Sequence, residues 1–149
     1  MNTVQVTNWH QLKILVSLAQ EYSEEDKQYD APFAVYAVEL VRRWQLPTYR
    51  FVLLYDESEP IGYTIMMTDE TGLNNTLYVQ DLYISKRHIG KQGFYALINE
   101  VYETAKKHNL ARGEFSSKLD IDTWKKLTNL PVNSKTRIIV DNDMYKEER

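Results

Sequence analysis

The stretch LYVQDLYIS-KRHIGKQG-FYALINEVYETAKKHN, residues 77–109, decides the fold of this chain. Its first part, Leu77–Ser85, is rich in β-branched and aromatic residues and predicts a strand. Its last part predicts an amphipathic helix, because apolar residues recur on one helical face: Phe94, Leu97, Ile98, Val101 and Ala105. The loop Lys86–Gly93 lies between them. A strand that enters a glycine-containing loop before a helix offers backbone N–H groups and a helix dipole to phosphate, so the stretch points to a phosphorylated cofactor.

The segments around this stretch predict a mixed α/β (α+β) architecture. Three consecutive strands are expected at 49–55, 61–68 and 76–85, and the turn-forming residues between them predict an antiparallel meander. Further strands are expected at 3–6, 112–116 and 136–140. Further helices are expected at 9–22, from Asp30 as N-cap to Trp44, and at 121–127. The acidic segment 22–30 lacks an apolar period and is interpreted as a solvated connector.

Composition limits the classes of function. The 149 residues carry a formal net charge of -3 with acidic and basic residues interspersed, so we expect no nucleic-acid partner. The length predicts one domain, 1–149. The sequence has no cysteine, no run of about 20 apolar residues, and three scattered histidines. We therefore expect a cytoplasmic protein with no disulfide, no membrane partner and no metal.

Two motifs and the order of the predicted elements resemble the GCN5-related N-acetyltransferase (GNAT) superfamily. FVLLYDESEPIGY, residues 51–63, is similar to the family's hairpin, in which a glycine stands between an apolar and an aromatic residue. Residues 78–109 align without gaps onto the family's fourth strand, pyrophosphate loop and following helix. The resemblance implies a GNAT-like, mostly antiparallel central sheet of about six to seven strands flanked by helices.

The resemblance also implies acetyl-CoA as cosubstrate. In that family the fourth strand splays from its neighbour and pairs with the pantetheine arm, while loop amides and the helix N-terminus hold the pyrophosphate. The family's loop pattern of Arg or Gln, then Gly, then Gly or Ala falls on Ile89, Gln92 and Phe94, which depart from it; a shifted loop uses Arg87 and Gly90 instead. The residues expected to bind the cofactor are Leu82, Tyr83, Ile84, Arg87, Ile89, Gly90, Lys91, Gln92, Gly93, Phe94, Ser117 and Trp124.

The catalytic base expected from the resemblance is altered. Relatives similar to diamine acetyltransferases carry a Glu in the fourth strand where this chain has Gln80. An amide does not accept a proton at neutral pH, so Gln80 is expected to orient the amine. Strand alternation predicts that Asp81 faces the opposite side of the sheet. The nearest carboxylates that a loop brings in are those of Asp69 and Glu70, with turn or capping residues as the alternative interpretation.

The catalytic acid of the family is a tyrosine in the short helix after the fifth strand. Trp124 occupies the corresponding position here, and an indole donates hydrogen bonds but is not a usable acid. Tyr145 or Tyr83 is the candidate that replaces it. Transfer from a thioester does not require a strong acid when the attacking amine is already neutral, so the loss of this group weakens activity without excluding it.

Two classes of function are compatible with these residues. The first is an N-acetyltransferase, which transfers an acetyl group from acetyl-CoA to a primary amine of a small molecule or a protein by direct attack in a ternary complex. The acidic segment 22–30 would then attract a cationic amine. The second is a catalytically inactive GNAT-fold protein that serves as an interaction or structural module, because fold does not fix function. A homodimer is possible in either case.

Overall fold

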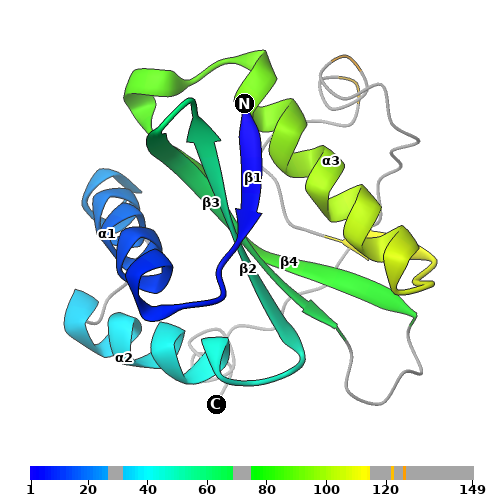
Figure 1. Cartoon of the computed structure of the whole chain (residues 1–149), viewed down its shortest axis with the longest axis horizontal. Coiled ribbons are helices and arrows are strands. Elements are labelled where there is room, and N and C mark those ends of the chain that lie inside the picture. Colours follow the sequence, from blue (N-terminus) through cyan, green and yellow to red (C-terminus); the bar gives the residue numbers. More distant parts are fainter. Residues whose placement is uncertain (27–31, 69–74, 115–121, 123–125, 127–149) are drawn as a thin grey trace, which may run out of the picture. The chain divides into compact units, whose positions relative to one another are not determined.

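The computed structural model describes residues 1–26, 32–68, 75–114, 122 and 126 (Figure 1). The chain divides into two compact units, Met1–Ser116 and Ser117–Arg149, and the fold below is that of the first unit. The strand expected at 136–140 lies outside the described residues, as does most of the helix expected at 121–127. The assignment of residues 1–149 to one domain therefore stays a prediction.

The described part contains nine elements in the predicted order. They are β1 (Asn2–Gln5), α1 (Trp9–Asp26), α2 (Phe33–Trp44), β2 (Tyr49–Asp56), β3 (Glu59–Thr68), β4 (Thr76–Ile84), the 3₁₀ turn η1 (Lys86–His88), α3 (Lys91–Lys107) and β5 (Arg112–Glu114). The strands form one sheet in the order β1-β2-β3-β4-β5. All neighbours are antiparallel except β4 and β5, which are parallel. This confirms the mixed architecture and the meander, with five strands among the described residues against the expected six to seven.

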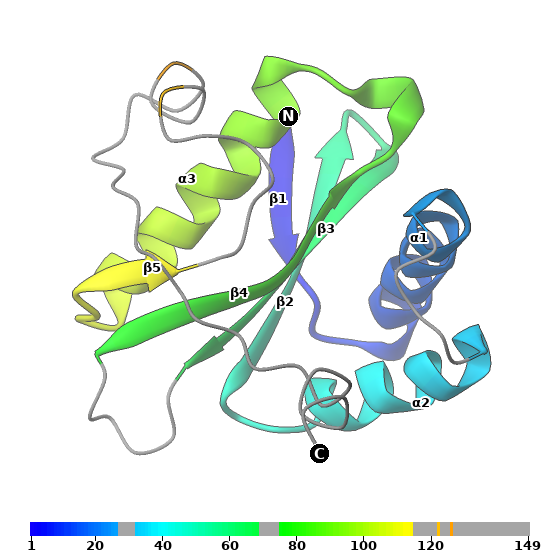
Figure 2. The same ribbon diagram turned by 180° about the vertical axis from the view of Figure 1, so that it is seen from behind.

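Helices cover both faces of the sheet. Helices α1 and α2 lie on one side and α3 on the other (Figures 1 and 2). On the first side the leucines of the two helices pack on β2, β3 and β4 through a buried cluster that includes Leu12, Leu15, Leu40, Phe51, Tyr63 and Tyr83. On the second side α3 contributes Leu97 and Val101 to two smaller clusters. Burying each of these side chains contributes about 1.5–3 kcal/mol, so the sheet is held between two apolar layers.

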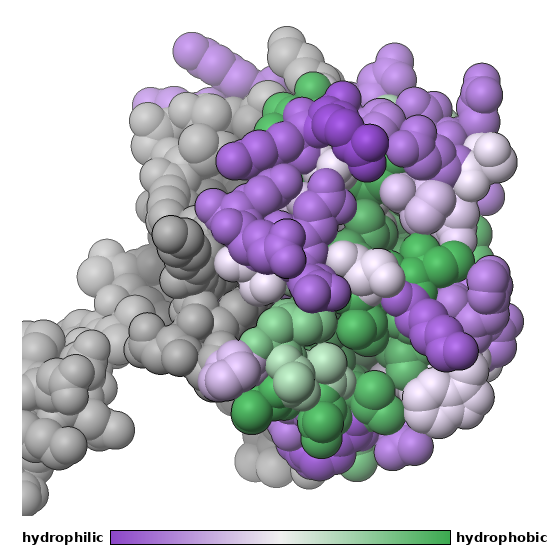
Figure 3. Space-filling view, turned by 90° about the vertical axis from the view of Figure 1, so that its left-hand side faces the viewer, coloured by the Kyte–Doolittle hydropathy of each residue, from purple (hydrophilic) through white to green (hydrophobic). Residues whose placement is uncertain are grey.

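The surface over α1 and α2 is mixed in polarity. Hydrophilic side chains gather over α1, and an apolar patch lies below them in Figure 3. The most exposed large apolar residues of α2 are Val35 and Val38. None of the helices that the structure describes is long and apolar enough to cross a membrane.

Helix α1 is longer than predicted, and this corrects the interpretation of the acidic segment. The helix continues through Asp26, so residues 22–26 are helical and do not form a connector. Tyr22 is half-buried and stacks on Tyr83 of β4, with ring centroids 4.9 Å apart. Through this ring contact the last turns of α1 pack on the sheet, and no apolar period in the sequence indicated that they would. Helix α2 has Pro32 at its N-cap position, and the predicted cap Asp30 lies outside the described residues.

Strand β4 contains a β-bulge at Gln80. Ile65 of β3 pairs with Asp81 and Met66 pairs with Val79, so the residue between these two has no cross-strand partner. The side-chain alternation shifts at this point. Before the bulge, Leu77 and Val79 face α3; after it, the residues that pack toward α3 are Leu82 and Ile84. The prediction that Asp81 faces the side of the sheet opposite to Gln80 is therefore wrong, because alternation does not continue through a bulge and both side chains contact α2.

Candidate active site

Among the residues that the structure describes, the outer edge of β4 is unpaired beyond the first residues of the strand, and we call this stretch the open edge. Strand β5 pairs only with Thr76, Leu77 and Tyr78, and no described strand pairs with this edge from the bulge to Ile84. A hollow of about 380 Å³ lies along this open edge, and we call it the edge hollow; it is lined by Tyr22, Glu25, Leu82, Tyr83, Ile84, Lys86 and Ile89. An open strand edge presents unpaired backbone N–H and C=O groups. The edge hollow can therefore receive an extended ligand that carries amide groups.

The loop after β4 leads from the edge hollow to the N-terminus of α3. The turn η1 is closed by a hydrogen bond of 2.8 Å from the His88 backbone N–H to the Ser85 carbonyl. Gly90 then stands at the N-cap of α3, without a side-chain cap and with no acidic residue in the first turn. The first N–H groups of a helix have no intrahelical partner, and the helix dipole is positive at this end. Lys86 and Arg87 are exposed on the same loop, so the loop suits a polyanion.

The two loop glycines have different environments. A Cβ atom on Gly90 would meet no atom within 4 Å, whereas one on Gly93 would lie 3.3 Å from the Leu54 Cδ2 atom. Gly93 is buried between α3 and the sheet, while Gln92 is exposed. Gly93 therefore allows close packing of the helix on the sheet, and Gly90 keeps the N-terminus of the helix accessible.

Tyr83 joins the edge hollow to the end of α1. Burial raises the pKa of the Tyr83 phenol, and the negative charges of Glu21 and Glu25 raise it further. Glu21 also accepts a hydrogen bond of 2.9 Å from the Ser85 hydroxyl. A phenol with a raised pKa is a weak proton donor, so the structure gives no support to Tyr83 as the catalytic acid.

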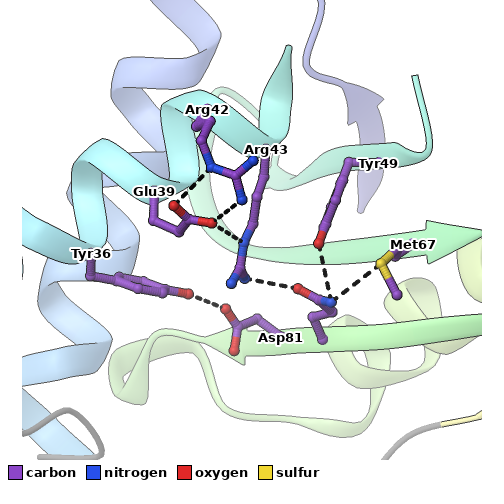
Figure 4. A network of polar contacts seen from close by, with 8 residues as sticks. Tyr36, Glu39, Arg42, Arg43, Tyr49, Met67 and Asp81 are labelled. Carbon is purple, nitrogen blue, oxygen red and sulfur yellow. Dashed lines mark hydrogen bonds and ion pairs between the residues drawn. The ribbon is translucent and has the colours of Figure 1, made fainter. Parts of the chain in front are cut away.

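At the bulge itself, the side chains of Gln80 and Asp81 both reach helix α2. The Tyr36 hydroxyl donates a hydrogen bond to Asp81 Oδ2 (Figure 4). Arg43 Nη1 donates to Gln80 Oε1 at 2.9 Å. The bulge thus places a carboxylate and an amide next to each other on the side of the sheet that α2 covers.

Asp81 provides the carboxylate in this part of the site. Burial raises its pKa, while the hydrogen bond from Tyr36 and the positive charge of Arg43 partly oppose the shift. A carboxylate with a raised pKa is a better proton acceptor near neutral pH than an exposed one. Asp81 is therefore suited to act as a base, whereas the neighbouring Gln80 amide is not.

The structure brings some of the predicted site residues together. Four of them, Leu82, Tyr83, Ile84 and Ile89, line the edge hollow. Gln80 lies at the bulge of β4. The others that are described belong to the loop or the first turn of α3: Arg87, Gly90, Gln92, Gly93 and the half-buried Phe94, with Lys91 placed only by its backbone. Glu70, Ser117, Trp124 and Tyr145 lie outside the described residues. Among the residues that are described, no group of three or more His, Asp or Glu side chains comes together as in a metal site.

Several residues of the site were not predicted from the sequence. Tyr22 and Glu25 belong to the last turn of α1, and Tyr36 and Arg43 belong to α2. Tyr36 did stand out as part of the apolar period of its helix, but nothing in the pattern marked its hydroxyl as a partner of Asp81. The bulge itself carries no Gly or Pro that would have indicated it.

The chain was compared with known proteins. No protein-family model and no curated protein matches its sequence. An aminoglycoside antibiotic 6'-N-acetyltransferase from Acinetobacter haemolyticus is 14% identical with a TM-score of 0.69, over 95% of this chain and 99% of that one. AAC(6')-Iy in complex with the bisubstrate analogue CoA-S-monomethyl-acetylneamine is 11% identical with a TM-score of 0.73, over 95% and 96%. A ribosomal-protein-alanine N-acetyltransferase from Brucella melitensis biovar Abortus 2308 is 13% identical with a TM-score of 0.66, over 95% and 100%.

These likenesses concern the fold, because the identities are low. All three structures are acetyltransferases. The chain therefore has the fold of the GCN5-related N-acetyltransferases, as its two motifs predicted.

Proposed function

We propose that this protein is an N-acetyltransferase that uses acetyl-CoA to acetylate a primary amine. The observation that carries the proposal is the open edge of β4, which borders the edge hollow and leads to the uncapped N-terminus of α3. The pantetheine arm of coenzyme A is extended and contains two amides, which suit a strand edge, and its pyrophosphate suits a helix N-terminus. That a structural neighbour holds a bisubstrate analogue containing CoA supports the same ligand class.

The reaction we propose is direct transfer. The amine nitrogen attacks the thioester carbonyl carbon of acetyl-CoA, a C–N bond forms, the C–S bond breaks, and coenzyme A leaves as a thiolate that takes up a proton. Asp81 accepts, directly or through water, the proton that the amine loses, because burial makes it the more basic carboxylate of this region. Tyr36 holds the carboxylate in place through its hydrogen bond. Gln80, which is not a base, contacts the acceptor next to Asp81 and so helps to orient the amine.

The substitution Gly90→Glu tests the cofactor site. Gly90 has an extended backbone with φ of -175° and open space around its Cα, so a side chain is accommodated without strain. A carboxylate at this position would repel the pyrophosphate at the N-terminus of α3. We expect isothermal titration calorimetry to show acetyl-CoA binding weakened by about 100-fold or more, with the free energy of unfolding unchanged within about 0.5 kcal/mol.

The matched control is Gly90→Ala, which adds a side chain at the same position without charge. We expect this variant to bind acetyl-CoA like the wild type. Equal binding by the wild type and Gly90→Glu would contradict the placement of the pyrophosphate. No detectable binding by the wild type at millimolar acetyl-CoA would contradict the proposed function and favour an interaction module.

A further inference from the structure

Arg43 reaches across the space between α2 and the β4 bulge. Its Nη1 donates to Gln80 Oε1 at 2.9 Å, and its guanidinium lies 5.9 Å from the centre of the Tyr49 ring. In Figure 4 the side chain extends from the helix toward the strand, on the same side as the Tyr36 and Asp81 pair. A fixed positive charge therefore stands beside the carboxylate to which we assign the base.

The position of this charge is held by Glu39. Glu39 accepts a hydrogen bond from Arg43 Nε at 3.1 Å, and it also forms an ion pair with Arg42. The hydrogen bond from Arg42 lowers the pKa of Glu39 to about 2, so its carboxylate is ionised throughout the neutral range. Two guanidinium groups share this single carboxylate, which leaves a net positive charge. Of the two arginines, Arg43 is the one that contacts β4.

Two N–H donor groups at Gln80 and Arg43 have weak hydrogen bonds or none among the described residues. Within the described part of the chain, Gln80 Nε2 donates two long hydrogen bonds, to the Tyr49 hydroxyl at 3.4 Å and to the Met67 sulfur at 3.6 Å. Arg43 Nη2 has no hydrogen-bond partner among the residues that the structure describes. An arginine fork with a neighbouring amide N–H group is a good site for a carboxylate, and it is a poor site for a second cationic group.

We infer that Arg43 and Gln80 bind a carboxylate of the acyl acceptor, so that the acceptor is a small zwitterion such as a free α-amino acid. This inference rests on the proposed function. The Cα atoms of Gln80 and Asp81 are about 3.8 Å apart, so the anion site and the base lie side by side. An α-amino acid carries its amine and its carboxylate on one carbon and fits this spacing. The site thereby discriminates against polyamines, which have no carboxylate.

The experiment compares acceptors that differ only in the carboxylate. Release of the coenzyme A thiol from acetyl-CoA is measured with the twenty L-amino acids and with their carboxamides. We expect at least one amino acid to be acetylated with a kcat/KM about 10-fold to 100-fold above that of its amide, the range that a charge-assisted hydrogen bond supplies. Arg43→Gln should remove this preference, mainly by raising KM for the amino acid, so that kcat/KM falls by more for the amino acid than for the amide.

Arg42→Gln is the matched control. It removes a guanidinium that shares Glu39 but does not contact β4, and its side chain is 59% exposed against 29% for Arg43. We expect it to keep the preference for the amino acid, and both variants should bind acetyl-CoA like the wild type. Three results would overturn the inference: equal rates with amino acids and their amides, no acceptor in the panel, or an equal loss on both acceptors in Arg43→Gln. The proposed function would still stand in these cases if the wild type binds acetyl-CoA. A wild type that binds no acetyl-CoA would overturn both.

Discussion

Asp81→Asn is expected to lower kcat/KM for acetyl transfer by about 10²-fold to 10⁴-fold, the usual contribution of a positioned general base. The amide has nearly the same shape as the carboxylate and still accepts a hydrogen bond from the Tyr36 hydroxyl, so the geometry of the bulge is preserved. Acetyl-CoA affinity, measured by calorimetry, should be unchanged because Asp81 is not among the residues that line the edge hollow. Full activity in this variant would contradict the role of Asp81.

The pH dependence of kcat/KM in the wild type also tests the role of Asp81. The reaction needs Asp81 ionised, and burial raises its pKa, so kcat/KM should fall as the pH is lowered through that raised pKa. In Asp81→Asn this acidic limb should disappear. An acidic limb that persists unchanged in the variant would assign it to another group.

Asp81→Asn is expected to lower activity but to raise the stability of the fold at neutral pH. Because the pKa of Asp81 is raised in the folded state, its ionisation favours the unfolded chain. Protonated Asp81 therefore adds to the free energy of unfolding. This added stability is fully present below the pKa of an unfolded aspartate, and it is lost as the pH rises through the pKa of Asp81 in the folded state. Asp81→Asn should therefore unfold at a higher urea concentration than the wild type at neutral pH, and at a similar concentration in acid. A gain in stability with a loss of activity is the pattern of a strained functional group.

Gly62→Ala is expected to destabilise the fold by about 3 kcal/mol or more, the upper range for overpacking a core. A Cβ atom at this position would lie 2.4 Å from the Tyr83 carbonyl oxygen, which is backbone of the neighbouring strand and cannot rotate away. Gly62 lies in β3 and pairs with Ile84, so any relief of the clash separates β3 from the part of β4 that borders the edge hollow. Urea denaturation measures the loss of stability.

Gly90→Ala is the control for Gly62→Ala, because the same methyl group is added where nothing lies within 4 Å. We expect its free energy of unfolding to change by less than about 0.5 kcal/mol. A Gly62→Ala variant as stable as this control would show that β3 and β4 separate without cost, and the packing of the sheet at this point would have to be revised.

The parts of the fold that were predicted correctly are those in which one strong period dominates. In α3 the apolar face contains Leu97, Ile98 and Val101, and all three are buried. The meander was marked by turn residues between β-rich segments. The end of α1 was missed because its last turns are acidic and their stability comes from the stacking of Tyr22 on Tyr83, a contact between residues far apart in the sequence.

The site was less predictable than the fold for a physical reason. Residues of the edge hollow that belong to β4 follow from the motif, but the bulge depends on how β4 pairs with β3, which no local pattern of β4 reveals. Once the bulge is present, Asp81 turns toward Tyr36, and Gln80 meets Arg43 from another helix. The loop residue Glu70 lies outside the described residues and stays a prediction, whereas the carboxylate that the bulge brings to α2 is that of Asp81.

The position of the bound ligand tests the proposed site most directly, and it is measured by amide chemical shifts of the ¹⁵N-labelled protein during titration with coenzyme A. The proposed site predicts the largest shifts along the open edge of β4, at Leu82–Ile84, and at the N-terminus of α3, at Gly90–Gly93. It predicts small shifts on the outer face of α2, at Val35 and Val38. Shifts confined to α2, or no shifts at millimolar coenzyme A, would contradict the acetyltransferase site.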